Sequence, residues 1–306
     1  MVLIARLIAD KVDWETRLDA IGRAVRPQSI GLTFNRGGSS LSYKYERTID
    51  EDAMVREIHW GETDPQVVAK IMDTHFADCD MVISSEGFWT PKLFVSDMDS
   101  TMIGQECIDE LADYAGLKDR IAAITERAMQ GELDFESALR ERVGLLKGLE
   151  ESAINRCLEE RISPSPGART LVQTLKAQGC RCVLVTGGFH HFGDRVADWL
   201  GFDRVVGNRL GVAQGKLTGD LDGPISHAGT KLAVLEEEAA RYGEAARVLA
   251  SGDGANDVPM LKAADYAFAY RAKPAARAEA NGRIESGELT HILTLLGIPH
   301  EEWVHD

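Results

Sequence analysis

Hydrophobic and polar positions follow two different patterns along the chain, and the change falls near residue 88. Before this point, apolar residues alternate in short runs or recur at helical spacing, in the order strand, helix, strands, helix, strand. This order is typical of a ferredoxin-like α+β sandwich. We therefore predict a small separate α+β domain over residues 1–88. Its predicted strands are 2–9, 30–34, 41–45, 54–60 and 81–84, and its predicted helices are 14–25 and 67–72.

From residue 91 onward, short apolar runs alternate with helical stretches. Such alternation is typical of a parallel sheet in an α/β fold. We predict a Rossmann-like parallel sheet within residues 89–306, with ligands bound beyond the carboxyl ends of its strands. The predicted strands are 93–96, 182–185, 204–206, 248–251 and 266–269, and the predicted helices include 168–177, 190–200 and 230–242.

A helical insertion separates the first two strands of this predicted sheet. Its apolar positions form three helical stripes, at 108–115, 121–128 and 135–146. An insertion directly after the first strand would cover the strand ends, where a lid over an active site belongs. We predict a helical cap over about residues 104–162.

Composition excludes several classes of function. The 306 residues suggest roughly two domains. With 34 Lys and Arg against 49 Asp and Glu, the formal charge is −15, so we expect neither a nucleic-acid partner nor an anionic membrane surface. No apolar run is long enough to span a bilayer, and the start of the chain does not resemble a secretory signal. Five scattered cysteines without CxxC pairs indicate reduced, packed thiols in a cytoplasmic protein.

Two aspartates follow the first strand of the predicted sheet. Asp97 and Asp99 are spaced so that both side chains can face one pocket. Because like charges this close cannot both ionise cheaply, we expect their pKa values to split, giving one ionised nucleophile and one protonated acid. The alternative is an Asp-rich turn or helix cap, which is common where a strand meets a helix.

A second acidic turn follows the strand at 248–251. Its glycines permit a tight turn close to an ion or phosphate, and Asp253 and Asp257 supply the hard oxygen ligands that Mg²⁺ prefers. The alternative is a plain turn in which Asp257 caps a helix that begins near Pro259.

Phosphate-binding candidates lie at two predicted helix starts. Thr186 and Gly187 precede a helix, where bare N–H groups and a hydroxyl can hold phosphate, although such turns are also common punctuation. Lys231 lies near a helix start, where the helix dipole disfavours a positive charge. A bound anion explains a lysine at this position better than a solvated surface location does.

Two charged residues of the predicted cap point to substrate recognition. Arg142 falls on the apolar stripe of its helix, and an inward guanidinium needs a partner. That partner is either a bound carboxylate or an acidic neighbour within the cap. Glu106, where the cap begins, could complement an ammonium group of the same ligand, or it could be a stabilising acid in the first turn of a helix.

The motifs described above, in their order along the chain, resemble those of the haloacid-dehalogenase superfamily and, within it, those of the phosphoserine phosphatases. The resemblance extends from about residue 93 to residue 299. One departure is Thr186, where that family usually has Ser. The amino-terminal unit, before the matching region, resembles the ACT-type regulatory domain only weakly. The matching segments are Asp97-Met98-Asp99-Ser100-Thr101, Glu106, Phe135-Glu136-Ser137-Ala138-Leu139-Arg140-Glu141-Arg142-Val143, Thr186-Gly187-Gly188, Asn208-Arg209-Leu210, Gly215-Lys216-Leu217-Thr218-Gly219, Lys231 and Gly252-Asp253-Gly254-Ala255-Asn256-Asp257.

The resemblance implies a role for each matching residue. Asp97 would be the nucleophile and Asp99 the general acid and base, with Mg²⁺ held by Asp97, the Asp99 carbonyl and Asp253. Asp257 would support the metal shell or Lys231. The implied substrate-binding residues are Glu106, Met129, Phe135, Arg142, Thr186, Gly187, Lys231 and Asn256, of which Asn256 could also support the metal.

The implied reaction is Mg²⁺-dependent hydrolysis of L-phosphoserine to L-serine and phosphate, the last step of serine biosynthesis. The partner is then a small-molecule substrate, and a homodimer could form through sheet edges. Alternatives within the superfamily are a phosphatase for phosphohomoserine or another small phosphate, a phosphotransferase and, less favoured, a dehalogenase. An alternative of a different class is an amino-acid sensor without catalysis.

Overall fold

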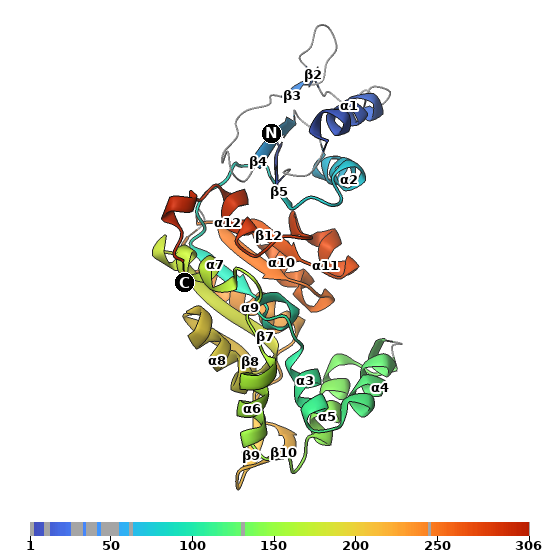
Figure 1. Ribbon diagram of the computed structural model, residues 1–306, viewed down its shortest axis with the longest axis vertical. Helices are drawn as coiled ribbons and strands as arrows, with labels where there is room; N and C mark the ends of the chain where they lie inside the picture. Colours follow the sequence, from blue (N-terminus) through green and yellow to red (C-terminus); the bar gives the residue numbers. More distant parts are fainter. Residues whose placement is uncertain are drawn as a thin grey trace.

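The computed structural model describes residues 3–8, 13–25, 33–34, 42–43, 55–60, 64–129, 132–243 and 246–305. A nine-stranded sheet runs through the molecule in the order β4-β1-β5-β13-β12-β11-β6-β7-β8. Figure 1 shows the amino-terminal strands and helices at one end of the long axis and the helices α3, α4 and α5 toward the other.

Six neighbouring strands of this sheet are parallel, which confirms the predicted α/β fold. All five predicted strands are present, but β7 extends further than expected and includes Thr186 and both following glycines. The strand β13 was not predicted, because three residues that include a glycine carry too little apolar pattern to signal a strand. The six strands are β6 (Leu93–Ser96), β7 (Arg181–Phe189), β8 (Arg204–Asn208), β11 (Val248–Gly252), β12 (Tyr266–Tyr270) and β13 (Gly282–Ile284).

Helices cover both faces of the parallel strands, so alternate strand residues enter two different cores. Phe94 and Leu184 pack on the face of α7 (Ala168–Ala177), α8 (His190–Leu200) and α12 (His291–Leu296). Val95 and Val183 pack on the opposite face, against α9 (Ala228–Ala239), α10 (Val258–Ala263) and α11 (Pro274–Glu279). Burial on both faces explains why these strands are apolar runs rather than alternating ones.

The predicted cap is helical, and its described residues form four helices, one more than the three helical stripes that the sequence indicates. They are α3 (Cys107–Tyr114), α4 (Lys118–Met129), α5 (Phe135–Leu145) and α6 (Ser152–Arg161). A hairpin of β9 (Leu210–Ala213) and β10 (Lys216–Leu221), which was not predicted, adjoins the cap in Figure 1. Its Leu217 exchanges backbone hydrogen bonds with Gly148 and Leu149, each at 2.8 Å. The cap is therefore tied to this hairpin between α5 and α6.

The amino-terminal strands form the antiparallel end of the sheet. The order β4-β1-β5 and the antiparallel pairing are compatible with a ferredoxin-like unit. The predicted strands 30–34 and 41–45 lie largely outside the described residues. The elements described are β1 (Leu3–Ile8), α1 (Trp14–Val25), β2 (Thr33–Phe34), β3 (Ser42–Tyr43), β4 (Val55–Trp60), α2 (Pro65–His75) and β5 (Met81–Ser84).

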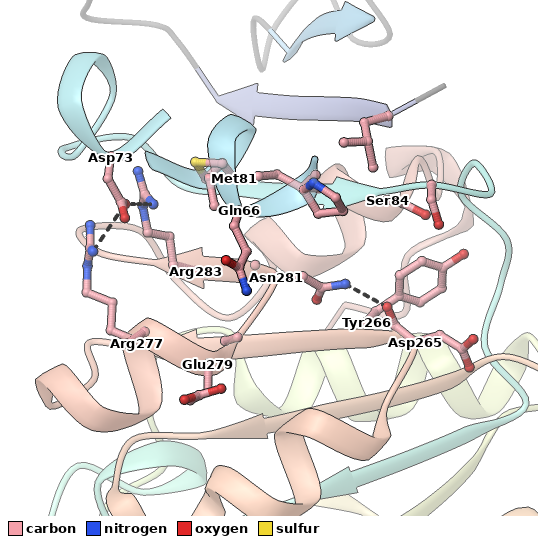
Figure 2. A pocket seen from close by; sticks show the side chains of 18 of the residues that line it. Gln66, Asp73, Met81, Ser84, Asp265, Tyr266, Arg277, Glu279, Asn281 and Arg283 are labelled. Atoms are coloured by element: carbon pink, nitrogen blue, oxygen red, sulfur yellow. Dashed lines mark hydrogen bonds and ion pairs between the residues drawn. The ribbon is translucent and has the colours of Figure 1, made fainter. Parts of the chain in front are cut away.

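The amino-terminal unit joins the parallel strands edge to edge. β5 pairs with β13 in antiparallel register, with Val82 opposite Gly282. Beside this seam, Asp73 of α2 binds Arg283 at 2.6 Å and Arg277 at 3.2 Å, as Figure 2 shows. A cavity of about 410 Å³ lies between α2, β5, β13 and the end of α11. None of the predicted site residues lines this cavity.

All five cysteines are buried and free, as expected. Among the described residues, none of the helices is both long and apolar enough to cross a bilayer.

Candidate active site

The carboxyl ends of three parallel strands bring the predicted polar residues together. Asp97 directly follows β6, and Asp253 directly follows β11, which is the neighbour of β6 in the sheet. On the other side of β6, β7 carries Thr186. Because the ends of parallel strands meet at one edge of a sheet, residues more than 150 positions apart in sequence become neighbours.

Lys231 is the fully buried centre of this group. Its ammonium lies 2.7 Å from Asp97 Oδ2 and 2.6 Å from Asp257 Oδ1. Burial acts to lower the pKa of Lys231, but the two carboxylates outweigh it and raise that pKa above its usual value. A buried cation at this place in the first turn of α9 is thus held by the two acids rather than by the helix dipole.

Asp257 is held in place through both of its oxygens. Oδ1 accepts from Lys231, while Oδ2 accepts from the backbone N–H groups of Asp253 at 3.1 Å and Gly254 at 2.9 Å. The turn also needs a glycine at 252, because a Cβ there would lie 2.4 Å from Asp257 Cγ. The alternative in which Asp257 merely caps α10 does not fit, since its side chain makes no capping hydrogen bond there.

The residues fit a magnesium ion. Asp97, Asp253 and Asp257 each offer a carboxylate oxygen within 4.8 Å of the others, and all three are buried. Donors contact both oxygens of Asp257 and both oxygens of Asp97, whose Oδ1 accepts from Met98 N at 2.7 Å. Asp253 has a recorded donor on Oδ2 alone among the described residues, which leaves its Oδ1 for a metal ion. Three buried carboxylates next to one buried ammonium leave an excess of negative charge, which a hard divalent cation would offset.

Asp99 is placed to hold and release a proton. It lies in the turn Met98–Met102, where Oδ1 accepts from Cys107 N at 3.3 Å. Burial, followed by repulsion from Glu106, raises the pKa of Asp99 to about 7. Burial, followed by repulsion from Asp257, also raises the pKa of Asp97, whereas Lys231 opposes this rise. Both pKa values are therefore raised, each first by burial, so the expected split into an ionised Asp97 and a protonated Asp99 is not seen in these shifts.

The end of β7 forms a cradle beside Asp99. Thr186 Oγ1 accepts from Gly188 N at 2.8 Å. A Cβ at Gly188 would lie 2.9 Å from Asp99 Oδ2 and 3.1 Å from Thr186 Oγ1, so glycine is needed for this close approach. Phe135 of the cap reaches the same place, since a Cβ at Gly187 would lie 3.6 Å from its ring.

Glu106 stands at the entrance to the cap. It is the residue before α3, but its side chain makes no capping hydrogen bond. Instead Glu106 Oε1 accepts from Ser100 Oγ at 2.8 Å. Burial raises the pKa of Glu106, while Ser100 acts in the opposite direction. The interpretation of Glu106 as a helix-stabilising acid is thus weakened.

Arg142 is half-buried on α5 and has no ion-pair partner among the described residues within salt-bridge distance. Its Nε donates to Ala138 O at 3.3 Å. Burial lowers the pKa of Arg142, and Asp109 and Glu106 act in the opposite direction. Among the described residues of the cap, no salt bridge to Arg142 is therefore seen.

Two predicted residues contribute less to this picture. Asn256 lies in the short turn Ala255–Asp257 and is half-buried, close to Gly254. Met129 ends α4, and its side chain lies outside the described residues.

Three residues that support the site were given no role from the sequence, although one of them, Asn208, lies in a matching segment. Lys273, just after β12, binds Asp253 Oδ2 at 3.0 Å through its ammonium and Asp253 O at 2.8 Å through its N–H. Asn208 donates to Gly187 O at 2.7 Å and accepts from Ser226 N at 2.8 Å, so it fixes the cradle from behind. Lys273 could have been found as a polar residue at a fifth strand end. Ser226 stands in an unpatterned loop that gives no such signal.

Comparison with known proteins agrees with this geometry. The sequence model of the family described as haloacid dehalogenase-like hydrolase matches residues 94–262, which is more than half of the chain. The chain belongs to this family. A phosphoserine phosphatase of Albidiferax ferrireducens is 46% identical over 210 residues, which are 67% of this chain and 89% of that protein.

Solved structures extend the likeness. A HAD family hydrolase of Salmonella enterica serovar Typhi superposes with a TM-score of 0.78 at 26% identity, covering 96% of this chain and 98% of the other. A structure described as a phospho-aspartyl intermediate analogue of phosphoserine phosphatase is 39% identical with a TM-score of 0.62, and covers 67% of this chain and 99% of its own. Together these likenesses show that this haloacid dehalogenase-like hydrolase is a phosphatase.

Proposed function

We propose that the chain hydrolyses L-phosphoserine to L-serine and phosphate, with Mg²⁺ as cofactor and Asp97 as the residue that is transiently phosphorylated. The observation that carries the proposal is the convergence of Asp97 and Asp253 in one buried, negatively charged cluster. The relative from Albidiferax ferrireducens, which bears the name phosphoserine phosphatase, supports the choice of substrate.

In the first step, a carboxylate oxygen of Asp97 attacks phosphorus in line with the serine oxygen. The bond between phosphorus and the serine oxygen breaks, and Asp99 gives its proton to that oxygen. A carboxyl with a pKa of about 7 is suited to this task, because it still holds a proton near neutral pH.

In the second step, water attacks the phosphorus of the aspartyl phosphate. Asp99, now ionised, takes a proton from this water, the bond between phosphorus and the Asp97 oxygen breaks, and phosphate leaves. Asp99 Oδ2 lies at the Gly188 cradle, next to where the phosphoryl group would sit, so one residue can serve both steps.

The remaining groups hold charge in place. Lys231, Thr186 and the Gly187 N–H would hold the phosphoryl oxygens. Mg²⁺ bound by Asp97, the Asp99 carbonyl and Asp253 would supply shielding between the anionic phosphate and the anionic nucleophile.

Two cap residues would recognise the amino-acid part of the substrate. Arg142, an inward guanidinium without an ion-pair partner among the described residues, would bind the carboxylate. Glu106 would bind the ammonium. Phe135, with its ring against Gly187, and Met129 would close the site while Asp97 attacks phosphorus.

The test is phosphate release from a panel of small phosphate esters, with and without Mg²⁺. L-phosphoserine should be the best substrate, ahead of phosphohomoserine, and EDTA should abolish turnover. Asp97→Asn should lower kcat by about a thousandfold or more, because an amide is not a nucleophile. Its melting temperature should not fall, since the change removes a negative charge from a cluster that has an excess of it.

Other outcomes separate the alternatives. Turnover that persists in EDTA would contradict the metal assignment. A preference for another ester would replace the substrate, and a new ester formed in excess serine would indicate a phosphotransferase. Binding of serine without release of phosphate from any ester would favour an amino-acid sensor.

We also propose that residues 1–88 form an ACT-like regulatory or dimerisation domain, separate from the phosphatase domain of residues 89–306. One hydrophobic cluster supports this division, since its buried members extend only from Leu3 to Ile83. Sedimentation of the full chain with and without L-serine tests both roles. A monomer whose mass, stability and activity do not change when L-serine is added would contradict both roles.

A further inference from the structure

Ser100, within the catalytic turn, has an unusual backbone. Its φ is 54° and its ψ is 9°, in the left-handed region. A side chain is disfavoured there, whereas glycine adopts the region without cost. A strained position next to a catalytic residue is a reason to ask what its side chain does.

The Ser100 side chain has one recorded partner. Its hydroxyl donates to Glu106 Oε1 at 2.8 Å. Within the part of the chain that the structure describes, the Ser100 hydroxyl is the one side-chain hydrogen-bond donor to Glu106. A glycine at 100 would remove the strain but also this hydrogen bond.

The hydrogen bond restrains a side chain that little else holds. Glu106 does not cap α3, and no salt bridge to it is recorded among the described residues. An acid that binds a substrate ammonium gains affinity if its side chain already points in the right direction. A side chain that must be ordered on binding loses conformational entropy, and this loss weakens the affinity. One oxygen of Glu106 is fixed by Ser100, and the other is left for a ligand.

We propose that Ser100 is a positioning residue that aims Glu106 at the ammonium group of the substrate, and thereby sets the preference for amino-acid phosphate esters over esters that lack an ammonium. This inference rests on the proposed function of the site. It adds a determinant of specificity, which acts through Glu106 and does not touch the substrate.

Ser100 could also act as part of a hinge between the core and the cap, and this role has to be distinguished from the positioning of Glu106. The same turn is the entrance to the cap, where Ile103 pairs with Pro164 and where Gln105 is hydrogen-bonded to Ser163. A hinge role for Ser100 would affect every substrate alike. Ser163 provides a matched control, because its hydroxyl accepts from Gln105 Nε2 at 3.1 Å at the same hinge but does not contact Glu106.

The experiment compares two substrates on the full chain with Mg²⁺. They are L-phosphoserine and the phosphate ester of 3-hydroxypropionate, which keeps the phosphate and carboxylate but has no ammonium. Ser100→Ala should raise KM for phosphoserine about tenfold, as expected for a lost hydrogen bond to a charged group, and leave KM for the ammonium-free ester within about twofold. Ser100→Gly should do the same, and because it relieves the strained φ it also secures a folded protein. Ser163→Ala should change neither KM.

A double-mutant cycle shows whether the effect passes through Glu106. In a Glu106→Gln background, Ser100→Ala should add little further loss on phosphoserine. Equal losses on both substrates, no loss at all, or a full additional loss in the Glu106→Gln background would each overturn the inference while leaving the proposed function in place. A wild-type protein that hydrolyses neither ester would overturn the proposed function, and the inference with it.

Discussion

Two groups of charged residues, each built around buried members, lie at different places in the same sheet, and they are balanced differently. The junction cluster, made of Asp80, Arg283, Asp73 and His291, lies where β5 meets β13. The second group, which we propose to be catalytic and call the catalytic cluster, is made of Asp97, Lys231, Asp253 and Asp257 and lies at the carboxyl ends of β6 and β11.

In the junction cluster, the protein itself supplies the partners of each buried charge. Asp80 accepts from the N–H groups of Glu285 at 2.6 Å, Ser286 at 3.2 Å and Gly287 at 3.1 Å, and it contacts His291 Nδ1 at 2.5 Å. These contacts leave Asp80 without need of a ligand.

Arg283 is balanced in the same way. Its guanidinium donates to Asp73 at 2.6 Å, to Phe76 O at 2.6 Å and to Cys79 O at 3.3 Å. The partners come from α2 and the loop after it, so these bonds join the amino-terminal unit to β13.

In the catalytic cluster, the carboxylates outnumber the cations. Asp97 and Asp257 share the buried ammonium of Lys231, while Asp253 has the ammonium of Lys273, whose side chain is 61% exposed. Buried charge is costly unless it is compensated. The comparison teaches that a balanced group of buried charges stabilises the fold, whereas an unbalanced one marks the place where a charged ligand binds.

The sharpest way to break the comparison is to remove the central cation of the catalytic cluster. Lys231→Met leaves Asp97 and Asp257 buried and uncompensated, so the free energy of unfolding should fall by about 3–5 kcal/mol. Urea unfolding in EDTA measures this. Lys273→Met is the matched control at the rim and should cost about 1 kcal/mol or less, because that lysine is exposed. A loss below about 1 kcal/mol for Lys231→Met would show that this cluster does not depend on its lysine.

A smaller effect is expected at the junction cluster. Asp80→Asn removes the charge that three backbone N–H groups and His291 contact, so stability should fall by about 2 kcal/mol. Phosphate release per folded molecule should stay the same, since Asp80 binds the residues that follow β13, and β12 separates this strand from β11 and β6, which Asp253 and Asp97 follow. Asp78→Asn, at an exposed neighbouring aspartate, should cost about 1 kcal/mol or less. A loss of turnover at unchanged stability would show that the junction acts on the catalytic cluster.

The smallest effect is the pH dependence of the junction cluster. Burial acts to raise the pKa of Asp80, but the hydrogen bonds from His291 and from the N–H groups of Glu285 and Ser286 outweigh it, and the pKa lies below its usual value. The ionised form is therefore favoured in the folded state. Its stabilisation is present above the unfolded pKa of about 3.9 and is lost as the pH falls through the folded pKa.

The measurement is urea unfolding of wild type and Asp80→Asn from about pH 6 down to about pH 3. The stability difference between them should be largest at the upper end and shrink below about pH 4. A difference that grows on acidification would contradict the assigned direction of the pKa shift.

Much of the fold could be predicted from the sequence. Apolar runs such as Leu93–Ser96 and helical stripes such as Ala168–Ala177 were assigned with the bounds that the structure has, because burial on one or two faces leaves a periodic trace. The hairpin of β9 and β10 and the strand β13 leave little trace, since they are short or rich in glycine. The predicted ligand roles of Asp97, Asp99, Asp253 and Lys231 remain predictions.

The arrangement of the site was predictable only in part. The sequence indicates that Asp97 and Asp253 end parallel strands, so their meeting was expected. It does not indicate that Ser100 donates to Glu106, or that Lys273 binds Asp253. These contacts depend on how turns fold back, which periodicity does not record.

By itself, the sequence determined the α/β fold, the cap and the set of polar residues that end the strands, because hydrophobic periodicity and turn chemistry are local properties. Only the tertiary structure decided which charges are balanced. Whether Lys231 serves two aspartates, and whether Asp80 is satisfied by backbone N–H groups, depends on distances between segments far apart in the chain. The pairing of β5 with β13 also depends on the tertiary structure, and it joins the amino-terminal strands and the parallel strands into one sheet.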